Sequence, residues 1–277
     1  MRGHGRSCKP NSLDGHSSEL YAADFKAVCD AFGLVKPVYC GWSLAAANIT
    51  DIVANLKPWP IAGAIALGGS PGINGDIVPV IGTPLLLKTL PRFNDNTNVS
   101  EAIAARIEFV DACFDEPDKV SHALKCRYLG ETLLQTPDVS ACVSMRPQDP
   151  EQLFEAGRNG LPLLVLFGKN DLLVNGEAVV NIVKPHFKNL QTVFIRGGHS
   201  LFDDNEDGMA EEVTKFVLSV QVGHPQILKS KASSSPFVIM SVKEQDLLGI
   251  AMYHFDPGPR GVFVVPVVRN PTISGAL

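Results

Sequence analysis

The chain has 277 residues, of which 45% are hydrophobic, and its formal net charge is -5 at pH 7. This length allows one large α/β domain or two small ones, and mild acidity without a basic cluster argues against nucleic-acid binding. The six cysteines are scattered without a CxxC pair, so neither a disulfide framework nor a metal site is expected, and no motif calls for a cofactor. Residues 1–7 lack the apolar segment of a secretory signal and no apolar run could span a bilayer, so we expect a cytoplasmic protein.

The first elements of the chain alternate between helix and strand. An apolar stripe predicts a helix over residues 19–33. The β-branched and aromatic run that starts at Pro37 predicts a buried strand, followed by a helix over 44–56 and a second strand over 61–67. This order implies a parallel sheet with right-handed crossovers.

The character of the sequence changes between about residues 73 and 158. Prolines and a polar, Asn-rich stretch replace the strands, and helical segments are expected near 100–115, 117–135 and 150–158. A helical insertion between two strands of a parallel sheet would lie over the carboxyl ends of the strands, where ligands bind in such folds. The insertion is therefore a candidate lid, and the alternative interpretation is a purely structural excursion.

Strand and helix alternate again after the insertion. The expected elements are a strand over 161–167, a helix over 176–187, a strand over 191–195 and a helix over 207–220. We therefore expect the α/β core to occupy residues 1–220. Residues 221–277 contain apolar, strand-like pieces near 237–242, 247–255 and 261–268. They carry no motif and are interpreted as a C-terminal extension of unknown role.

Ser43 stands where the first expected strand turns into a helix. Gly41 precedes it by two positions and Ala45 follows it by two, which is the pattern of a nucleophile elbow, a strained turn that presents the serine hydroxyl to a cleft. The backbone N–H of Leu44 would lie at a helix N-terminus, where it could stabilise an oxyanion. The alternative is an ordinary strand and helix with an incidental serine.

Asp171 and His199 complete a pattern for nucleophilic catalysis. A serine nucleophile needs a histidine to take its proton and a carboxylate to orient the imidazole. Asp171 follows the strand over 161–167, and His199 follows the strand over 191–195 in a Gly-Gly-His-Ser loop. Parallel strands bring their carboxyl ends to one edge of a sheet, so the three side chains are expected to meet. Of the remaining histidines, His16 is expected to be exposed.

These residues resemble the α/β-hydrolase superfamily from Arg2 to about Val220. The similar segments are the loop Arg2-Gly3-His4-Gly5-Arg6-Ser7, the elbow Gly41-Trp42-Ser43-Leu44-Ala45, the acid turn Gly168-Lys169-Asn170-Asp171 and the histidine loop Gly198-His199. The resemblance implies the α/β-hydrolase fold, a mostly parallel sheet flanked by helices, with a cap over roughly 73–158. It also implies that Ser43 is the nucleophile, Asp171 the orienting acid and His199 the general base. Serine at the elbow favours esterase, lipase or thioesterase chemistry.

The chain departs from the family pattern in two places. Ala45 replaces the second glycine of the elbow, a change that is tolerated because alanine is small. The family normally has several strands before the Arg-Gly-x-Gly loop, including a His-Gly segment that supplies a second oxyanion donor. The resemblance therefore implies an N-terminally shortened version of the fold. The strand before Ser43 would then have an open edge, which the apolar tail over 237–268 is a candidate to cover.

The sequence thus predicts a serine hydrolase that cleaves an ester or thioester of a small, largely apolar substrate through an acyl-enzyme on Ser43. One alternative is acyl transfer or product release in a biosynthetic pathway with the same triad. The other is a catalytically impaired or non-enzymatic relative that lacks the N-terminal oxyanion segment. The expected partner is a small-molecule ester or thioester, with no nucleic acid and no membrane span. The substrate and the oligomeric state are left open.

Overall fold

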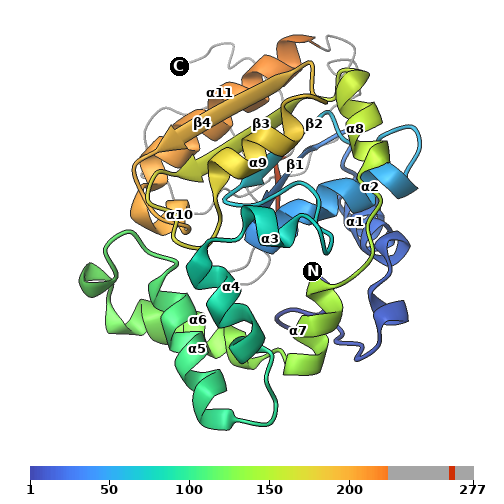
Figure 1. Ribbon diagram of the computed structural model, residues 1–277. Helices are drawn as coiled ribbons and strands as arrows, with labels where there is room; N and C mark the ends of the chain where they lie inside the picture. The colour runs from blue at the N-terminus through green and yellow to red at the C-terminus, as the bar shows by residue number, and fades with distance from the viewer. Residues whose placement is uncertain (224–261, 266–277) are drawn as a thin grey trace, which may run out of the picture.

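A five-stranded β-sheet forms the centre of the molecule (Figure 1). The computed structural model describes residues 1–223 and 262–265. The strands are β1 (Val38–Trp42), β2 (Gly63–Leu67), β3 (Leu163–Gly168), β4 (Leu190–Ile195) and β5 (Val262–Val265). They lie in the order β4-β3-β2-β1-β5. Strands β1 to β4 run parallel and β5 runs antiparallel to β1, so the expected mostly parallel sheet is confirmed.

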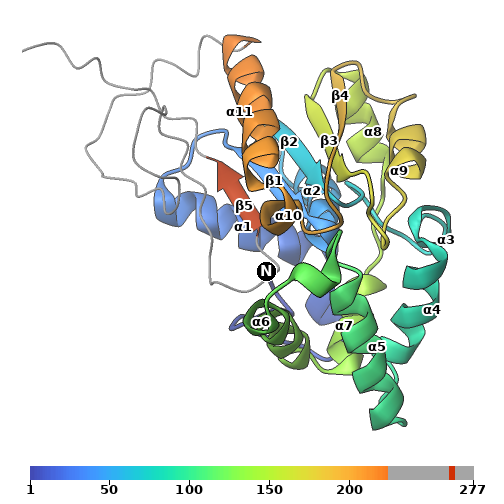
Figure 2. The same cartoon turned by 90° about the vertical axis from the view of Figure 1, so that its left-hand side faces the viewer.

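Helices cover both faces of this sheet. Outside the insertion they are η1 (Leu13–His16), α1 (Ser18–Phe32), η2 (Ser43–Ala47), α2 (Asn48–Asn55), α9 (Gly176–Val183), α10 (Leu201–Asp204) and α11 (Glu206–Gly223). Figure 2 shows α11 on one side of the strands and α9 on the other. Within the described part of the chain, no helix combines the length and the apolar character needed to cross a bilayer.

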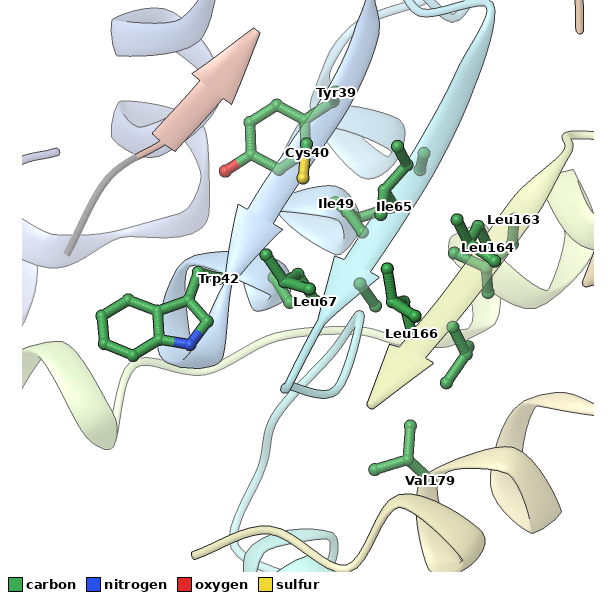
Figure 3. Close-up of a cluster of buried hydrophobic side chains, with 14 of the residues drawn as sticks. Tyr39, Cys40, Trp42, Ile49, Ile65, Leu67, Leu163, Leu164, Leu166 and Val179 are labelled. Atoms are coloured by element: carbon green, nitrogen blue, oxygen red, sulfur yellow. The ribbon is translucent and has the colours of Figure 1, made fainter. Parts of the chain in front are cut away.

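The three central strands are buried along their whole length because helices pack on both sides of them. Every residue of β1, β2 and β3 is buried, as continuous apolar runs predict for a doubly covered parallel sheet. Figure 3 shows Ile65 of β2 and Leu164 of β3 in one cluster with Ile49 of α2. Strand β4 lies at the edge of the sheet and is partly exposed.

The insertion contains more helices than the sequence predicted. They are α3 (Val78–Ile81), α4 (Pro84–Phe93), α5 (Val99–Asp111), η3 (Pro117–Lys119), α6 (His122–Leu133), α7 (Pro137–Ser144) and α8 (Glu151–Arg158). Helices α3, α4 and α7 lie outside the helical segments that the sequence predicted. Pro84 and Pro137 each open a helix, a position where the missing N–H costs no hydrogen bond. Thr83 caps α4 by accepting a hydrogen bond from the Leu86 N–H at 3.2 Å.

Strand β5 covers the outer edge of β1. Val38 of β1 is paired with Val265 and Gly41 with Val262. The expectation that the tail covers the edge of the strand before Ser43 is therefore confirmed for residues 262–265. The other strand-like pieces, 237–242 and 247–255, lie outside the described residues. The division of the chain at residue 220 stays a prediction.

A buried polar cluster joins the end of the insertion to α2. The Arg146 guanidinium, which is fully buried, lies 3.0 Å from Asp51 Oδ2 and 3.0 Å from Asn48 Oδ1. Gln148 donates hydrogen bonds to Asp51 Oδ1 at 2.7 Å and to the Ala47 carbonyl at 2.8 Å. These contacts pair both charges and hold α2 and the last residue of η2 against the insertion.

The prediction that His16 is exposed was wrong. The ring is completely buried next to the N-terminal end of α1. Its Nδ1 lies 2.9 Å from the Tyr21 hydroxyl, and its Nε2 lies 2.8 Å from the Pro10 carbonyl. Both ring nitrogens thus have hydrogen-bond partners in the protein, so burial leaves neither of them unpaired.

We expect Arg146→Met to lower the free energy of unfolding by about 3–5 kcal/mol, because Asp51 would stay buried without its cation. Urea unfolding followed by circular dichroism measures the change. Arg106 of α5 is the matched control. It is also buried and lies over the Phe93 ring, 4.3 Å from its centroid, but it makes no ion pair with a carboxylate in the described chain. Arg106→Met should be neutral or stabilising, and equal losses in the two variants would contradict the argument.

Candidate active site

Ser43 is the first residue of η2 and lies in a strained turn directly after β1. Its φ angle is 53°, a left-handed conformation that non-glycine residues rarely adopt and that is found at functional turns. Two close backbone approaches explain the glycines around it. A Cβ atom on Gly41 would stand 2.4 Å from the Ala45 carbonyl oxygen, and one on Gly69 would stand 2.1 Å from the Ser43 carbonyl oxygen. The local geometry is therefore that of the expected nucleophile elbow.

The structure brings Ser43, Asp171 and His199 into contact, although they are far apart in the sequence. His199 Nε2 lies 2.8 Å from Ser43 Oγ, and His199 Nδ1 lies 2.8 Å from Asp171 Oδ2. The histidine and aspartate side chains are only 1% and 3% exposed. Asp171 and His199 follow β3 and β4, so the meeting point is the carboxyl edge of the parallel strands, as the sequence predicted.

Each partner of Ser43 is held by contacts of its own. Asp171 Oδ1 accepts hydrogen bonds from the backbone N–H groups of Leu173 and Val174, both at 2.9 Å, which directs Oδ2 toward the imidazole. Trp42 Nε1 donates to the His199 carbonyl at 2.8 Å, and the two rings lie 5.3 Å apart. Trp42 thus contacts His199 through its indole N–H and its ring, a contact that the elbow pattern did not indicate.

A tyrosine from the insertion reaches the histidine loop. Tyr128 of α6 hydrogen-bonds Asp203, and its hydroxyl lies 3.0 Å from Ser200 Oγ. Burial raises the pKa of Tyr128 above its ordinary value. Burial also raises the pKa of the Asp203 carboxyl, and the hydrogen bond from Tyr128 opposes this rise. This contact links α6 to the residue that follows His199, and no sequence pattern pointed to it.

Cys40 is the nearest thiol to the elbow along the chain, but its surroundings make it a poor nucleophile. It is buried within β1, and burial raises the pKa of its thiol to about 12. Since the thiolate is the reactive form, this cysteine is inert at neutral pH.

The described residues contain no group of three or more His, Cys, Asp or Glu side chains that could hold a metal ion.

A cavity of about 160 Å³ opens beside Ser43 and His199. Leu44, which was expected to supply an oxyanion donor, also lines it. Helices α3, α4 and α5 supply apolar walls, and a second group of lining residues is polar: His4, Ser70, Gln135, Ser140 and Ser144. The sequence suggested only that the insertion covers the site. It gave no reason to select Gln135 or Ser140, because isolated polar residues in a helical segment look like solvent-facing ones.

A model of the alpha/beta hydrolase fold matches residues 1–206, and the chain belongs to this family. The resemblance drawn from the elbow, acid turn and histidine loop is therefore confirmed, as is the predicted fold of a mostly parallel sheet flanked by helices with a helical insertion. The N-terminal shortening stays a prediction. The insertion over the carboxyl ends of the strands agrees with that fold.

Solved structures similar to this one include esterases. A putative aryl esterase from Burkholderia cenocepacia superposes with a TM-score of 0.70 at 21% identity, covering 80% of this chain and 79% of its own. An esterase from Rhodococcus sp. ECU1013 has a TM-score of 0.70 at 26% identity, covering 79% of this chain and 78% of its own. A non-heme chloroperoxidase from Streptomyces lividans is 35% identical over 72 residues, which are 26% of this chain and 25% of the length of that relative.

Proposed function

We propose that the protein is a serine hydrolase that cleaves an ester or thioester of a small, largely apolar compound. The observation that carries the proposal is the pair of 2.8 Å contacts that His199 makes, with Ser43 Oγ on one side and Asp171 on the other. These are the distances at which an imidazole can accept a proton from a serine while a carboxylate stabilises the resulting cation. The similarity to the esterase from Rhodococcus supports the same class.

Each group has a defined role in the proposed reaction. Ser43 Oγ attacks the carbonyl carbon of the substrate while its proton passes to His199 Nε2. The negative charge on the carbonyl oxygen is held by the Leu44 N–H. The tetrahedral intermediate then collapses: the bond to the alcohol or thiol breaks, His199 protonates the leaving group, and an acyl ester on Ser43 remains. Water then attacks this ester while His199 takes its proton. When this second intermediate collapses, the bond to Ser43 Oγ breaks, His199 returns the proton to Oγ, and the carboxylic acid product is released.

Covalent labelling with a fluorophosphonate tests this function. Such probes are attacked by an activated serine and need no knowledge of the substrate, so the folded wild-type protein should be labelled at one residue. Peptide mass spectrometry should place the label on Ser43. Hydrolysis of p-nitrophenyl esters of increasing acyl length, measured in parallel, gives the acyl preference. A protein that is folded by circular dichroism but is neither labelled nor active would instead be the impaired relative.

A further inference from the structure

The cavity beside Ser43 has two chemically different ends. Apolar side chains from α3, α4 and α5 form one end: Val78, Ile81, Leu86, Leu90, Phe93 and Phe109. The polar end is formed by His4, by Gln135, which follows α6, and by Ser140 of α7. Figures 1 and 2 both show α4 separated from the N-terminus, with α7 close to the N-terminus in Figure 1. A bound molecule can therefore contact an apolar surface with one part and hydrogen-bonding groups with another.

The polar end is built around the backbone of Gly3. The Gln135 amide nitrogen donates a hydrogen bond to the Gly3 carbonyl at 2.7 Å, which fixes the orientation of the side chain. A Cβ on Gly3 would stand 2.6 Å from Val143 Cγ2, so Gly3 packs closely against α7. This contact places Gln135 beside the helix that carries Ser140. The two side chains thus belong to one preformed patch.

Gln135 and Ser140 both have hydrogen-bonding capacity that the described residues leave unused. Ser140 is only 5% exposed, and no partner for its hydroxyl is found in residues 1–223 or 262–265. The Gln135 carbonyl oxygen likewise has no partner there. Together they offer a hydroxyl, which can donate or accept, and an amide acceptor. Both residues line the cavity and neither atom is fully enclosed by protein, so a ligand group that reaches both can form hydrogen bonds with them.

Among the described residues, no Asp or Glu side chain lines the cavity. A cationic substrate group would therefore lose its hydration without gaining an anionic partner from this lining, and such a transfer is strongly unfavourable. A neutral hydroxyl or amide, by contrast, needs only hydrogen bonds in exchange. The described lining thus selects against cationic groups.

We propose that the substrate is an ester with two arms and no cationic group, and that Gln135 and Ser140 determine its specificity. An apolar arm lies against α3, α4 and α5, and the other arm carries a neutral hydrogen-bonding group that contacts Gln135 and Ser140. This inference rests on the proposed hydrolase function and adds the class of substrate to it. Gln135 and Ser140 act in recognition, apart from the groups that move protons.

Matched esters test the proposal. Butyl and 3-hydroxypropyl hexanoate differ only by a methyl or a hydroxyl at the end of the alcohol arm, and methyl heptanoate and methyl 6-hydroxyhexanoate differ in the same way on the acyl arm. In at least one pair, Ser140→Ala should lower kcat/KM of the hydroxylated ester about 3–10-fold, the effect of one hydrogen bond. It should leave the plain ester within about two-fold. Choline hexanoate should be hydrolysed about 100-fold less efficiently than its neutral isostere, 3,3-dimethylbutyl hexanoate.

Two further variants make the outcome decisive. The measured ratio is kcat/KM of the hydroxylated ester divided by kcat/KM of its plain partner. Gln135→Leu should lower this ratio in the same pair as Ser140→Ala does. Ser219→Ala on α11, outside the cavity, should leave the ratio unchanged in both pairs. If the wild-type enzyme hydrolyses the esters but neither cavity variant changes the ratio in either pair, the proposed specificity is wrong. Equal rates for choline hexanoate and its isostere would also overturn it. Failure of the hydrolase function itself is distinct, since no ester would then react and no fluorophosphonate label would appear.

Discussion

Replacing Ser43 with alanine is expected to lower kcat for ester hydrolysis by on the order of 10⁶-fold, the loss seen when the nucleophile of such a triad is removed. The reason is that His199 Nε2, 2.8 Å from Oγ in the wild-type protein, would have no attacking hydroxyl to deprotonate. Initial rates with a p-nitrophenyl ester measure the change, and the fluorophosphonate label should disappear with the activity.

Ser70 provides the control for this experiment. It lines the same cavity, but its hydroxyl donates to the Gly72 carbonyl at 2.7 Å and contacts no imidazole of the described histidines. Ser70→Ala should therefore keep the covalent label. A Ser43→Ala protein that remains labelled, with circular dichroism unchanged, would show that another residue reacts with the probe.

Replacing Asp171 with asparagine is expected to lower kcat about 10⁴-fold, a loss typical of removing the negative charge of the orienting acid. The Asp171 carboxylate accepts a hydrogen bond from His199 Nδ1–H at 2.8 Å, which keeps the proton on Nδ1 and leaves Nε2 free to take the serine proton in the proposed reaction. An asparagine amide placed at the same point can offer an N–H instead, which favours the wrong tautomer. The rate of fluorophosphonate labelling should fall in parallel, and pre-steady-state measurements of the label distinguish slow attack from weak binding.

A neighbouring carboxylate shows whether the effect is specific. Asn170, the residue before Asp171, donates a side-chain hydrogen bond to Asp115 at 2.7 Å. Asp115 does not touch His199 in the described contacts. Asp115→Asn should change kcat by no more than about two-fold, as for an ordinary surface substitution. Comparable losses in both variants would mean that the turn after β3 matters as a whole rather than through Asp171.

The sequence predicted the sheet and the meeting of three side chains because both depend on local patterns. Apolar runs such as 161–167 identify buried strands, and a residue that follows a parallel strand must lie at its carboxyl edge. Ser43, Asp171 and His199 each stand at such a position, so their convergence followed from topology without any knowledge of the loops between them. Strand β5 was anticipated in the same way, from the open edge that it covers.

The insertion and the cavity were harder to predict because their features arise from tertiary contacts. Pro84 and Pro137 each begin a helix that no predicted segment included. His16 was expected to be exposed, and it is buried because Pro10 and Tyr21 supply partners for its ring nitrogens. Gln135 takes its meaning from Gly3, more than a hundred positions earlier, and no periodicity encodes a pair so distant.

Trp42 and Ser43 are adjacent in the chain, and both contact His199: Ser43 Oγ lies 2.8 Å from Nε2, and Trp42 Nε1 donates a hydrogen bond to the His199 carbonyl. A slip of β1 by one residue would displace both contacts together. We therefore expect the two contacts to form in the same step of folding. Under the proposed function, the rate of ester hydrolysis would report the fraction of molecules in which β1 has its native register.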